Sequence, residues 1–184
     1  MDDLETITEE REPQTQCPYC LIAEGKLPAL TVYTDDILIA ALEIKPANIG
    51  HVIVFPKRHV QTLSQLSDSE IKRLFSITTK ISSVLGQLAI GVNTIVSEKE
   101  PAGQLFNHLT INIIPRFDND GLNFQWSPKP VDEEQLKKLH SVISEELGKA
   151  TKQPVEEIVE VKEDVEEMNK RLEKELIKPE DRLL

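Results

Sequence analysis

Residues 106–115 of the chain read FNHLTINIIP, and the alternation within this stretch predicts a β-strand. Successive side chains of a strand point to opposite faces of the sheet. One face of this strand would be wholly aliphatic, with Leu109, Ile111 and Ile113. The other face would be mixed, with His108, Thr110, Asn112 and Ile114. The mixed face is therefore the place to look for functional side chains.

Four further strands are expected upstream of this stretch, over residues 31–34, 37–44, 51–56 and 92–97. The segment HVIVFP at 51–56 is almost wholly apolar, which predicts a strand buried on both faces. A helix is expected between the last two of these strands. Ser67 and Glu70 have the spacing of a capping box, and apolar residues then recur at three- and four-residue steps as far as Leu88.

The size and composition of the chain are those of a soluble protein. It has 184 residues, of which 39% are hydrophobic and 29% charged, so one compact domain with additional segments is expected. No apolar run approaches the roughly 18 residues that a membrane span needs. The acidic N-terminus is the reverse of the basic start of a signal peptide, which predicts a cytoplasmic protein.

The net charge of −11 argues against a protein that holds nucleic acid, because such binding depends mainly on Lys and Arg meeting phosphates. A small local phosphate pocket remains compatible with it. Residues 1–15 contain six acidic residues and one arginine, a net charge of −5, and lack any periodicity. They are expected to form a disordered acidic tail.

The C-terminal part carries a second pattern. A helix is expected from about Asp132 to Leu147, followed by a linker over 148–154. Beyond the linker, apolar residues follow a 3-4-3-4 spacing at Ile158, Val161, Val165, Met168 and Leu172. This heptad-like seam leaves three interpretations open: a surface helix folded back on the core or on a partner subunit, a self-pairing coil, or disorder.

These boundaries predict three parts: the tail at 1–15, a domain at 16–147, and a charged helical extension at 148–184. The extension is a plausible contact surface for a protein partner.

The two cysteines, Cys17 and Cys20, form a C-x-x-C motif that indicates metal binding or redox chemistry in an intracellular chain. A thioredoxin-like motif would begin a helix within a strand–helix–strand unit, whereas this one precedes two expected strands. Zinc would need two more ligands. Of the four histidines, His140 is expected on a solvated helix face, and local chemistry does not choose between His51 and His59.

Taken together, several segments resemble the histidine-triad (HIT) family, and within it the zinc-containing prokaryotic branch. They occur in the family's order over roughly residues 16–130 and comprise Cys17–Cys20, Gly50–His59, Ala102–Gln104, His108–Arg116 and Asp120–Phe124. The resemblance implies an α+β fold with an antiparallel five-stranded sheet. It also implies a homodimer in which two such sheets join into one of ten strands.

The resemblance further implies a zinc site whose ligands are Cys17, Cys20, His59 and His108. It thus selects His59 where local chemistry did not. Four protein ligands make a closed, structural site that leaves no position for a reacting water.

The triad itself departs from the family pattern. In the family the middle histidine attacks the α-phosphate of a nucleotide, and that position is Thr110 here; the third position is Asn112. A threonine hydroxyl is a weak nucleophile that needs an adjacent base. His108 would be committed to zinc, which leaves only His51 as a candidate base. A catalytically inactive protein is therefore expected.

The positions that would hold a nucleotide are partly retained. On the nucleoside side, Glu43 matches an acidic residue that binds ribose, and Ile22 and Ile44 match apolar positions beside the base. On the phosphate side, Ser97 replaces an asparagine, and Leu105 replaces a serine after Gly103 and Gln104.

The expected function is thus an inactive zinc-containing HIT protein that binds a purine nucleotide or serves as a scaffold. The alternative is a divergent nucleotide hydrolase or nucleotidyl transferase that uses Thr110 or a water activated elsewhere.

Overall fold

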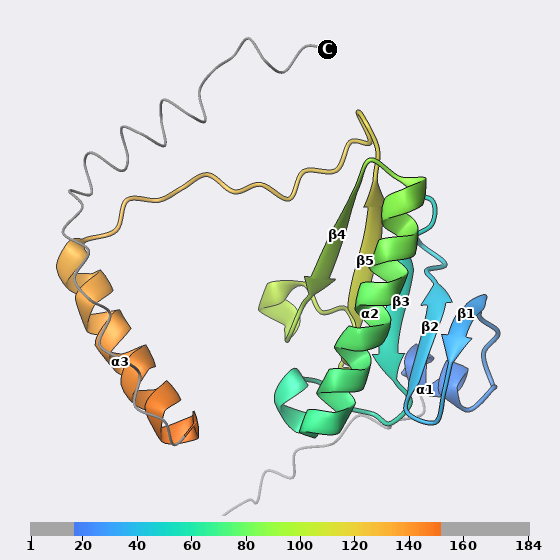
Figure 1. The fold of residues 1–184 in the computed structure, drawn as a ribbon, viewed down its shortest axis with the longest axis horizontal. Coiled ribbons are helices and arrows are strands. Elements are labelled where there is room, and N and C mark those ends of the chain that lie inside the picture. Colours follow the sequence, from blue (N-terminus) through green and yellow to red (C-terminus); the bar gives the residue numbers. More distant parts are fainter. Residues whose placement is uncertain (1–16, 152–184) are drawn as a thin grey trace, which may run out of the picture. The chain divides into compact units, whose positions relative to one another are not determined.

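The computed structural model describes residues 17–151 (Figure 1). The predicted acidic tail and the heptad-like seam lie outside the described residues. The chain divides into two units, one ending at Phe124 and the other beginning at Gln125. This division differs from the predicted domain boundary after residue 147, because the last helix groups with the C-terminal unit.

The first unit is built on one antiparallel sheet whose strand order is β1-β2-β3-β5-β4. Its strands are β1 (Thr31–Thr34), β2 (Leu38–Leu42), β3 (Val52–Pro56), β4 (Gly91–Val96) and β5 (Ile111–Arg116). All residues of β3 are buried, as predicted, since it lies at the centre of the sheet with layers on both sides. The expected α+β fold with five antiparallel strands is confirmed, and β1 and β4 form its edges.

Helix α2 (Asp68–Leu88) covers one face of the sheet (Figure 1). The predicted capping box starts it: the Glu70 amide donates to the Ser67 hydroxyl, and the Ser67 amide donates to the Glu70 carboxylate. Leu74, Ile77 and Leu85 of α2 pack in one core with the aliphatic face of residues 109–113. The helix therefore buries the aliphatic face formed by Leu109, Ile111 and Ile113.

A short helix, α1 (Pro18–Ala23), covers part of the opposite face and was not predicted. Tyr19, Ile22 and Ala23 pack against a second apolar cluster from β2 and β3, formed by Ile39, Ala41, Ile53 and Phe55. Pro18 occupies the first turn of α1, where a missing N–H costs nothing. The C-x-x-C motif thus begins a helix, although within residues 17–151 no strand precedes that helix as a thioredoxin-like unit would require.

Strand β5 begins at Ile111, later than the predicted start at Phe106. Before Ile111 the backbone bonds outside the sheet ladder, since the Leu109 amide donates to the Val60 carbonyl at 2.6 Å. The side-chain alternation nevertheless holds, because the three aliphatic residues 109, 111 and 113 are all fully buried. His108 consequently lies in a loop at the end of the sheet and not in a strand.

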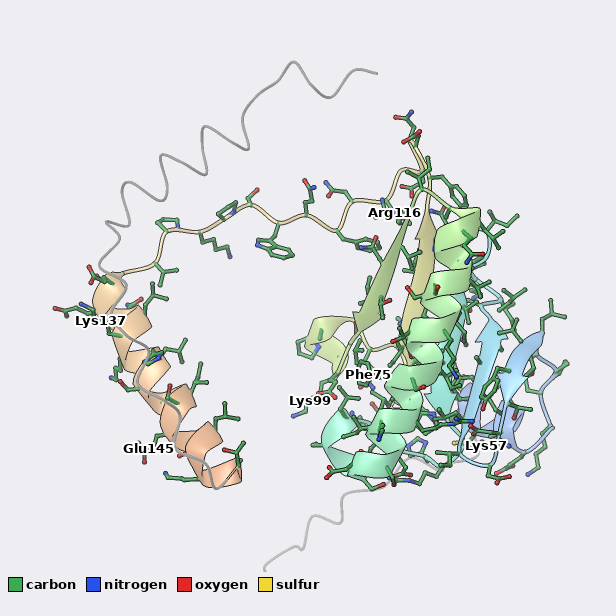
Figure 2. The ribbon with its side chains drawn as sticks, viewed as in Figure 1. Lys57, Phe75, Lys99, Arg116, Lys137 and Glu145 are labelled. Carbon is green, nitrogen blue, oxygen red and sulfur yellow. The ribbon has the colours of Figure 1, made fainter. Side chains whose placement is uncertain are left out.

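Two ion pairs fix the ends of the sheet. Asp35, in the predicted turn between β1 and β2, accepts hydrogen bonds from Arg73 of α2 at 2.7 Å and from the Tyr33 hydroxyl at 2.8 Å. At the opposite end Arg116 binds both carboxylate oxygens of Asp120, at 2.6 and 2.9 Å. Figure 2 shows Arg116 at one end of the sheet and Lys57, which follows β3, at the other.

Two 3-10 turns complete the first unit, η2 (Leu63–Gln65) and η3 (Glu100–Ala102). The second unit contains α3 (Glu133–Thr151), which begins after Asp132 as expected, and the Asp132 carboxylate accepts a hydrogen bond from the Gln135 amide at 3.1 Å. The helix continues through Gly148, so the linker predicted from residue 148 does not begin there. Within residues 17–151, no helix is both long and apolar enough to cross a membrane.

Candidate metal centre

Four side chains from three separate segments meet at the end of the sheet where β3 ends. Cys17 and Cys20 lie at the start of α1, His59 follows β3, and His108 precedes β5. Their potential ligand atoms all lie within 4.8 Å of one another. These are the four residues that the sequence analysis assigned to a metal, so the structure brings the whole set together.

The spacing of the donor atoms fits a tetrahedral metal ion. The Cys17 Sγ lies 3.4 Å from the His108 Nδ1, and the Cys20 Sγ lies 3.2 Å from the His59 Nδ1 and 3.6 Å from the His108 Nδ1. Zinc bonds of about 2.0–2.3 Å at tetrahedral angles place neighbouring donors roughly 3.6 Å apart. Two sulfur and two imidazole donors at this spacing match a structural zinc site.

His108 is oriented by a hydrogen bond on its far side. Its Nε2 lies 2.8 Å from the Pro56 carbonyl oxygen, so this nitrogen carries the proton and donates it. The Nδ1 that faces the cysteines is then unprotonated and free to bind a metal. Burial lowers the pKa of His108 to about 4, which keeps the imidazole neutral at physiological pH.

The thiol of Cys20 needs a cation if it is to be ionised. Burial raises its pKa to about 11, so without a metal the group is a thiol at neutral pH. A bound metal ion would displace that proton, because the metal ligand is the thiolate. The donor chemistry is therefore suited to a divalent cation and poorly suited to an unassisted reactive cysteine.

The centre rests on a cluster of aromatic rings. Tyr19, between the two cysteines, has its ring 5.0 Å from that of Phe55 and 5.4 Å from that of His108. Phe55 also packs edge-on against His108, at 5.8 Å. This packing explains why α1 forms: the tyrosine anchors the helix to the sheet, and the cysteines on either side then face the histidines.

One side of the centre is open to solvent. His59 is exposed, and together with Cys20 it lines a pocket of about 380 Å³. Lys26, Lys57 and Arg58 also border this pocket. Lys26 pairs with Glu24 at 2.7 Å, and Arg58 pairs with Glu70 at 2.7 Å. Two of the three cations at the open side of the cluster are thus paired with carboxylates, and one of those carboxylates, Glu24, also lines the pocket.

Thr110 and Asn112, at the other two positions of the expected triad, are not among the four clustered donors. The Asn112 Oδ1 is 3.1 Å from the His51 Nε2, and the His51 Nδ1 accepts a hydrogen bond from the Ala47 amide at 3.2 Å. His51 therefore donates through Nε2 to the asparagine. Burial lowers the pKa of His51, which keeps it neutral. Thr110 is half-buried, and within residues 17–151 its hydroxyl has no hydrogen-bond partner.

The expected nucleotide positions fall into two groups. Ile22 is half-buried against the β2–β3 cluster, Glu43 accepts a hydrogen bond from the Lys45 amide at 2.9 Å, and Ile44 is exposed. Ser97 and Gly103 lie in the segment after β4, on either side of η3. No hydrogen bond joins the two groups within the described part of the chain.

Gln104, the sixth of these positions, ties the loop around η3 to the metal centre. Its amide nitrogen donates to the Gln61 carbonyl at 2.8 Å and to the His108 carbonyl at 3.3 Å. Its amide oxygen accepts a hydrogen bond from the Lys99 backbone at 2.8 Å. Gln104 thus has a structural role besides any contact with a ligand. This role and that of Pro56 are not predictable from the sequence, because a backbone carbonyl can accept a hydrogen bond at a residue of any type.

Known proteins with similar sequences support these observations. A model of the HIT domain matches residues 24–119. An uncharacterized HIT-like protein of Borreliella burgdorferi is 35% identical over 133 residues, which are 70% of this chain and 96% of that protein. The adenosine 5′-monophosphoramidase of Schizosaccharomyces pombe is 27% identical over 132 residues, 71% of this chain and 98% of that enzyme.

Solved structures agree with the sequence matches. A HIT family protein from Bacillus subtilis has a TM-score of 0.66 and 31% identity, over 71% of this chain and 96% of that chain. A zinc-bound histidine triad family protein from Mycobacterium smegmatis has a TM-score of 0.55 and 27% identity, over 74% and 98% of the two chains. With the family model, the shared fold and the four gathered donors all in agreement, the chain belongs to the HIT family.

Proposed function

We propose that this chain is a zinc-containing HIT homodimer that has lost nucleotidyl-transfer chemistry and acts by binding, either of a purine nucleotide or of another protein. The observation that carries the proposal is the contrast between positions 108 and 110, which lie two residues apart in the sequence. His108 is fully buried and fitted to a metal, whereas the position of the middle histidine is occupied by Thr110, whose hydroxyl has no hydrogen-bond partner within residues 17–151.

The neighbouring imidazoles are both committed elsewhere. His108 uses Nε2 for the Pro56 carbonyl and presents Nδ1 to the cysteines. His51 uses Nδ1 for the Ala47 amide and Nε2 for Asn112. A threonine hydroxyl attacks only when a base accepts its proton. With these four ring nitrogens engaged, neither histidine is placed to activate Thr110, and this argues against the divergent hydrolase or transferase.

The zinc would have a structural role. Its ligands join α1 to the segment after β3 and to the loop before β5, three parts of the chain that lie far apart in sequence. When bound, the metal would supply cross-linking and no Lewis-acid position, because four protein donors fill a tetrahedral shell. Such a site contributes to the free energy of folding.

The dimer is supported by the free edge of β4. This strand is the last in the order β1-β2-β3-β5-β4, so one side of its backbone has no partner strand within the described residues. An unprotected edge is a template for pairing with another chain. Antiparallel pairing of β4 with β4 of a second copy would make the ten-stranded sheet that the resemblance implies.

A nucleotide would be held mainly by its nucleoside half. Glu43 is half-buried beside exposed Ile44, and a carboxylate at this place can accept hydrogen bonds from ribose hydroxyls. The phosphate side is weaker, because Ser97 and Leu105 stand where the family has phosphate contacts. We infer that this cytoplasmic protein binds AMP with modest affinity. A protein partner would bind through the C-terminal unit.

Turnover of adenosine 5′-monophosphoramidate by the zinc-loaded full-length protein tests the inactivity. Loss of an attacking side chain costs about 10⁶-fold in other enzymes, so the wild-type rate should fall at least 10⁴-fold below that of the fission-yeast relative measured in parallel. A Thr110→Ala variant should be indistinguishable from wild type. A rate near that of the relative, abolished in Thr110→Ala with zinc retained, would establish the divergent enzyme instead.

Calorimetric titration with AMP tests the binding role separately. We expect measurable binding that weakens in Glu43→Gln, with Glu24→Gln as the control, since Glu24 lines the pocket beside the metal and not the ribose position. Absence of AMP binding would remove the nucleotide from the proposal and leave the scaffold role.

A further inference from the structure

Helix α3 carries an apolar face that nothing in the described chain covers. Leu136, Leu139, Ile143 and Leu147 follow steps of three and four residues, and each is 51–56% exposed. No residue of the 19-residue helix is buried. An isolated helix of this length is only marginally stable in water, and most of its stability in a protein comes from packing an amphipathic face. The face therefore requires an occupant.

We propose that the occupant is residues 155–172 of the same chain, folded back on α3 as the second arm of an antiparallel helical hairpin. This segment lies outside the described residues, and it follows α3 directly after Thr151. Both arms fall within the C-terminal unit that begins at Gln125. No contact with the HIT domain is needed for the hairpin to form.

The apolar residues of the two arms are placed nearly symmetrically on either side of Lys152. In an antiparallel pair, residues equally far from the turn lie at the same level, since each advances the helix by about 1.5 Å. Ile143 and Val161 are both nine residues from Lys152. Leu139 and Val165 are both 13 residues away, and Leu136 and Met168 are both 16 away.

Nearest the turn, Leu147 is five residues and Ile158 six residues from Lys152. Three apolar pairs thus meet at the same level, and the pair nearest the turn is offset by one residue, about 1.5 Å along the helix axis. A midpoint at Lys152, directly after the last residue of α3, is the register that a hairpin formed by the same chain requires.

The residues that connect the two arms favour a reversal of the chain direction. Residues 152–154 are Lys-Gln-Pro, and Pro154 lacks the N–H that a continuing helix would use and clashes with the preceding turn. Proline is also favoured at the first turn of a new helix. Antiparallel helices are commonly joined by loops of about 2–5 residues. The alternative of one long continuous helix would place Pro154 in its interior.

Hydrogen exchange of the full-length, zinc-loaded protein tests the hairpin. Val165→Asp puts a charge into the seam, and we expect the amides of residues 139–147 to exchange at least about tenfold faster. Val159→Asp is the matched control: the same change in the same segment, one residue past a seam position, should leave α3 protection unchanged. Amides of β3 and β5 report in each sample that the HIT domain is still folded.

The register is tested by introducing opposite charges at two residues that the hairpin places opposite each other. Leu139→Lys should lose α3 protection, and adding Val165→Glu should restore part of it, whereas adding Val159→Glu should not. Failure of Val165→Asp to alter α3, or equal effects of the two aspartate variants, would overturn the proposal.

A second copy of the chain is the competing occupant, and mixing separates it. Labelled Val165→Asp protein is mixed with an excess of unlabelled wild type and left for subunits to exchange. Within a hairpin the variant chain stays unprotected, because each chain covers only its own α3. Recovery of α3 protection in the labelled chain would assign the face to a second copy and refute the hairpin.

Discussion

His108 donates a hydrogen bond from Nε2 to the Pro56 carbonyl at 2.8 Å, and this bond ties the loop before β5 to the end of β3. It fixes which nitrogen is protonated and turns the other toward Cys17 and Cys20. The ring joins the last residue of β3 to the metal centre. His108 therefore has a structural role that does not depend on which residue occupies position 110.

Removing one cysteine should remove the metal and loosen α1. The wild-type protein should contain about one zinc per chain, and Cys20→Ser should contain none, because three ligands hold zinc far less tightly than four. Zinc binding is coupled to folding, so the variant should lose several kcal/mol of stability. Metal analysis and thermal unfolding of freshly purified protein measure both.

His140→Ala is the control for this experiment, since that histidine is exposed on α3 and outside the metal cluster. It should keep both the zinc and the unfolding temperature of the wild type. Metal-free wild-type protein with Cys17 and Cys20 joined in a disulfide would contradict the zinc assignment.

Tyr19 should stabilise the metal centre through packing and not through its hydroxyl. Its ring contacts those of Phe55, Phe106 and His108. Truncating a large aromatic side chain in a core costs about 3–5 kcal/mol, and Tyr19 is half-buried, so Tyr19→Ala should cost about 2 kcal/mol. We expect faster zinc loss to a chelator in Tyr19→Ala and near wild-type behaviour in Tyr19→Phe. Equal zinc release from the two variants would show that the ring does not support the site.

The sequence was sufficient for the features that depend on local periodicity. The alternation at 109–113 placed three aliphatic residues in the core correctly, and the capping box at Ser67 located the start of α2. The four candidate metal ligands, which the structure gathers within 4.8 Å of one another, were predicted through the resemblance to a family. Local chemistry alone had left His51 and His59 equivalent, because nothing in the sequence shows that His51 turns toward Asn112.

Features decided by tertiary contacts were not predictable. Helix α1 has only six residues, too few for a periodic pattern, and its stability comes from Tyr19 packing on Phe55. The late start of β5 follows from the backbone hydrogen bond between the Leu109 amide and the Val60 carbonyl. The side chains of these residues do not predict that contact. The continuation of α3 through Gly148 overrides the low helix propensity of glycine.

The Arg116–Asp120 pair should make stability sensitive to acid. The Arg116 guanidinium, followed by the Leu122 amide, holds the pKa of Asp120 well below its usual range. A depressed folded-state pKa adds stability above the unfolded value of about 3.9, and this is lost as the pH falls through the folded value. Urea unfolding from pH 7 to 2 should show a steeper acid loss for wild type than for Asp120→Asn.

Asp118→Asn changes an exposed carboxylate of the same loop and serves as the control. Its unfolding profile should run parallel to that of the wild type at every pH. If the Asp120→Asn profile were also parallel, the carboxylate would not be the source of the acid sensitivity.

Asn112 should control the protonation of His51. In the wild type, burial lowers the pKa of His51, and the Asn112 amide oxygen accepts its Nε2 proton at 3.1 Å. Asn112→Asp keeps the acceptor and adds a negative charge, which favours the imidazolium and should raise the pKa. Stability from the new pair would then be present at low pH and be lost as the pH rises through the raised pKa. Asn112→Leu removes the acceptor, leaves the Nε2 proton unpaired, and should cost about 1–3 kcal/mol. Nitrogen-detected imidazole titration by NMR follows His51 directly, with exposed His140 as the internal reference, and an identical His51 pKa in all three proteins would refute the coupling.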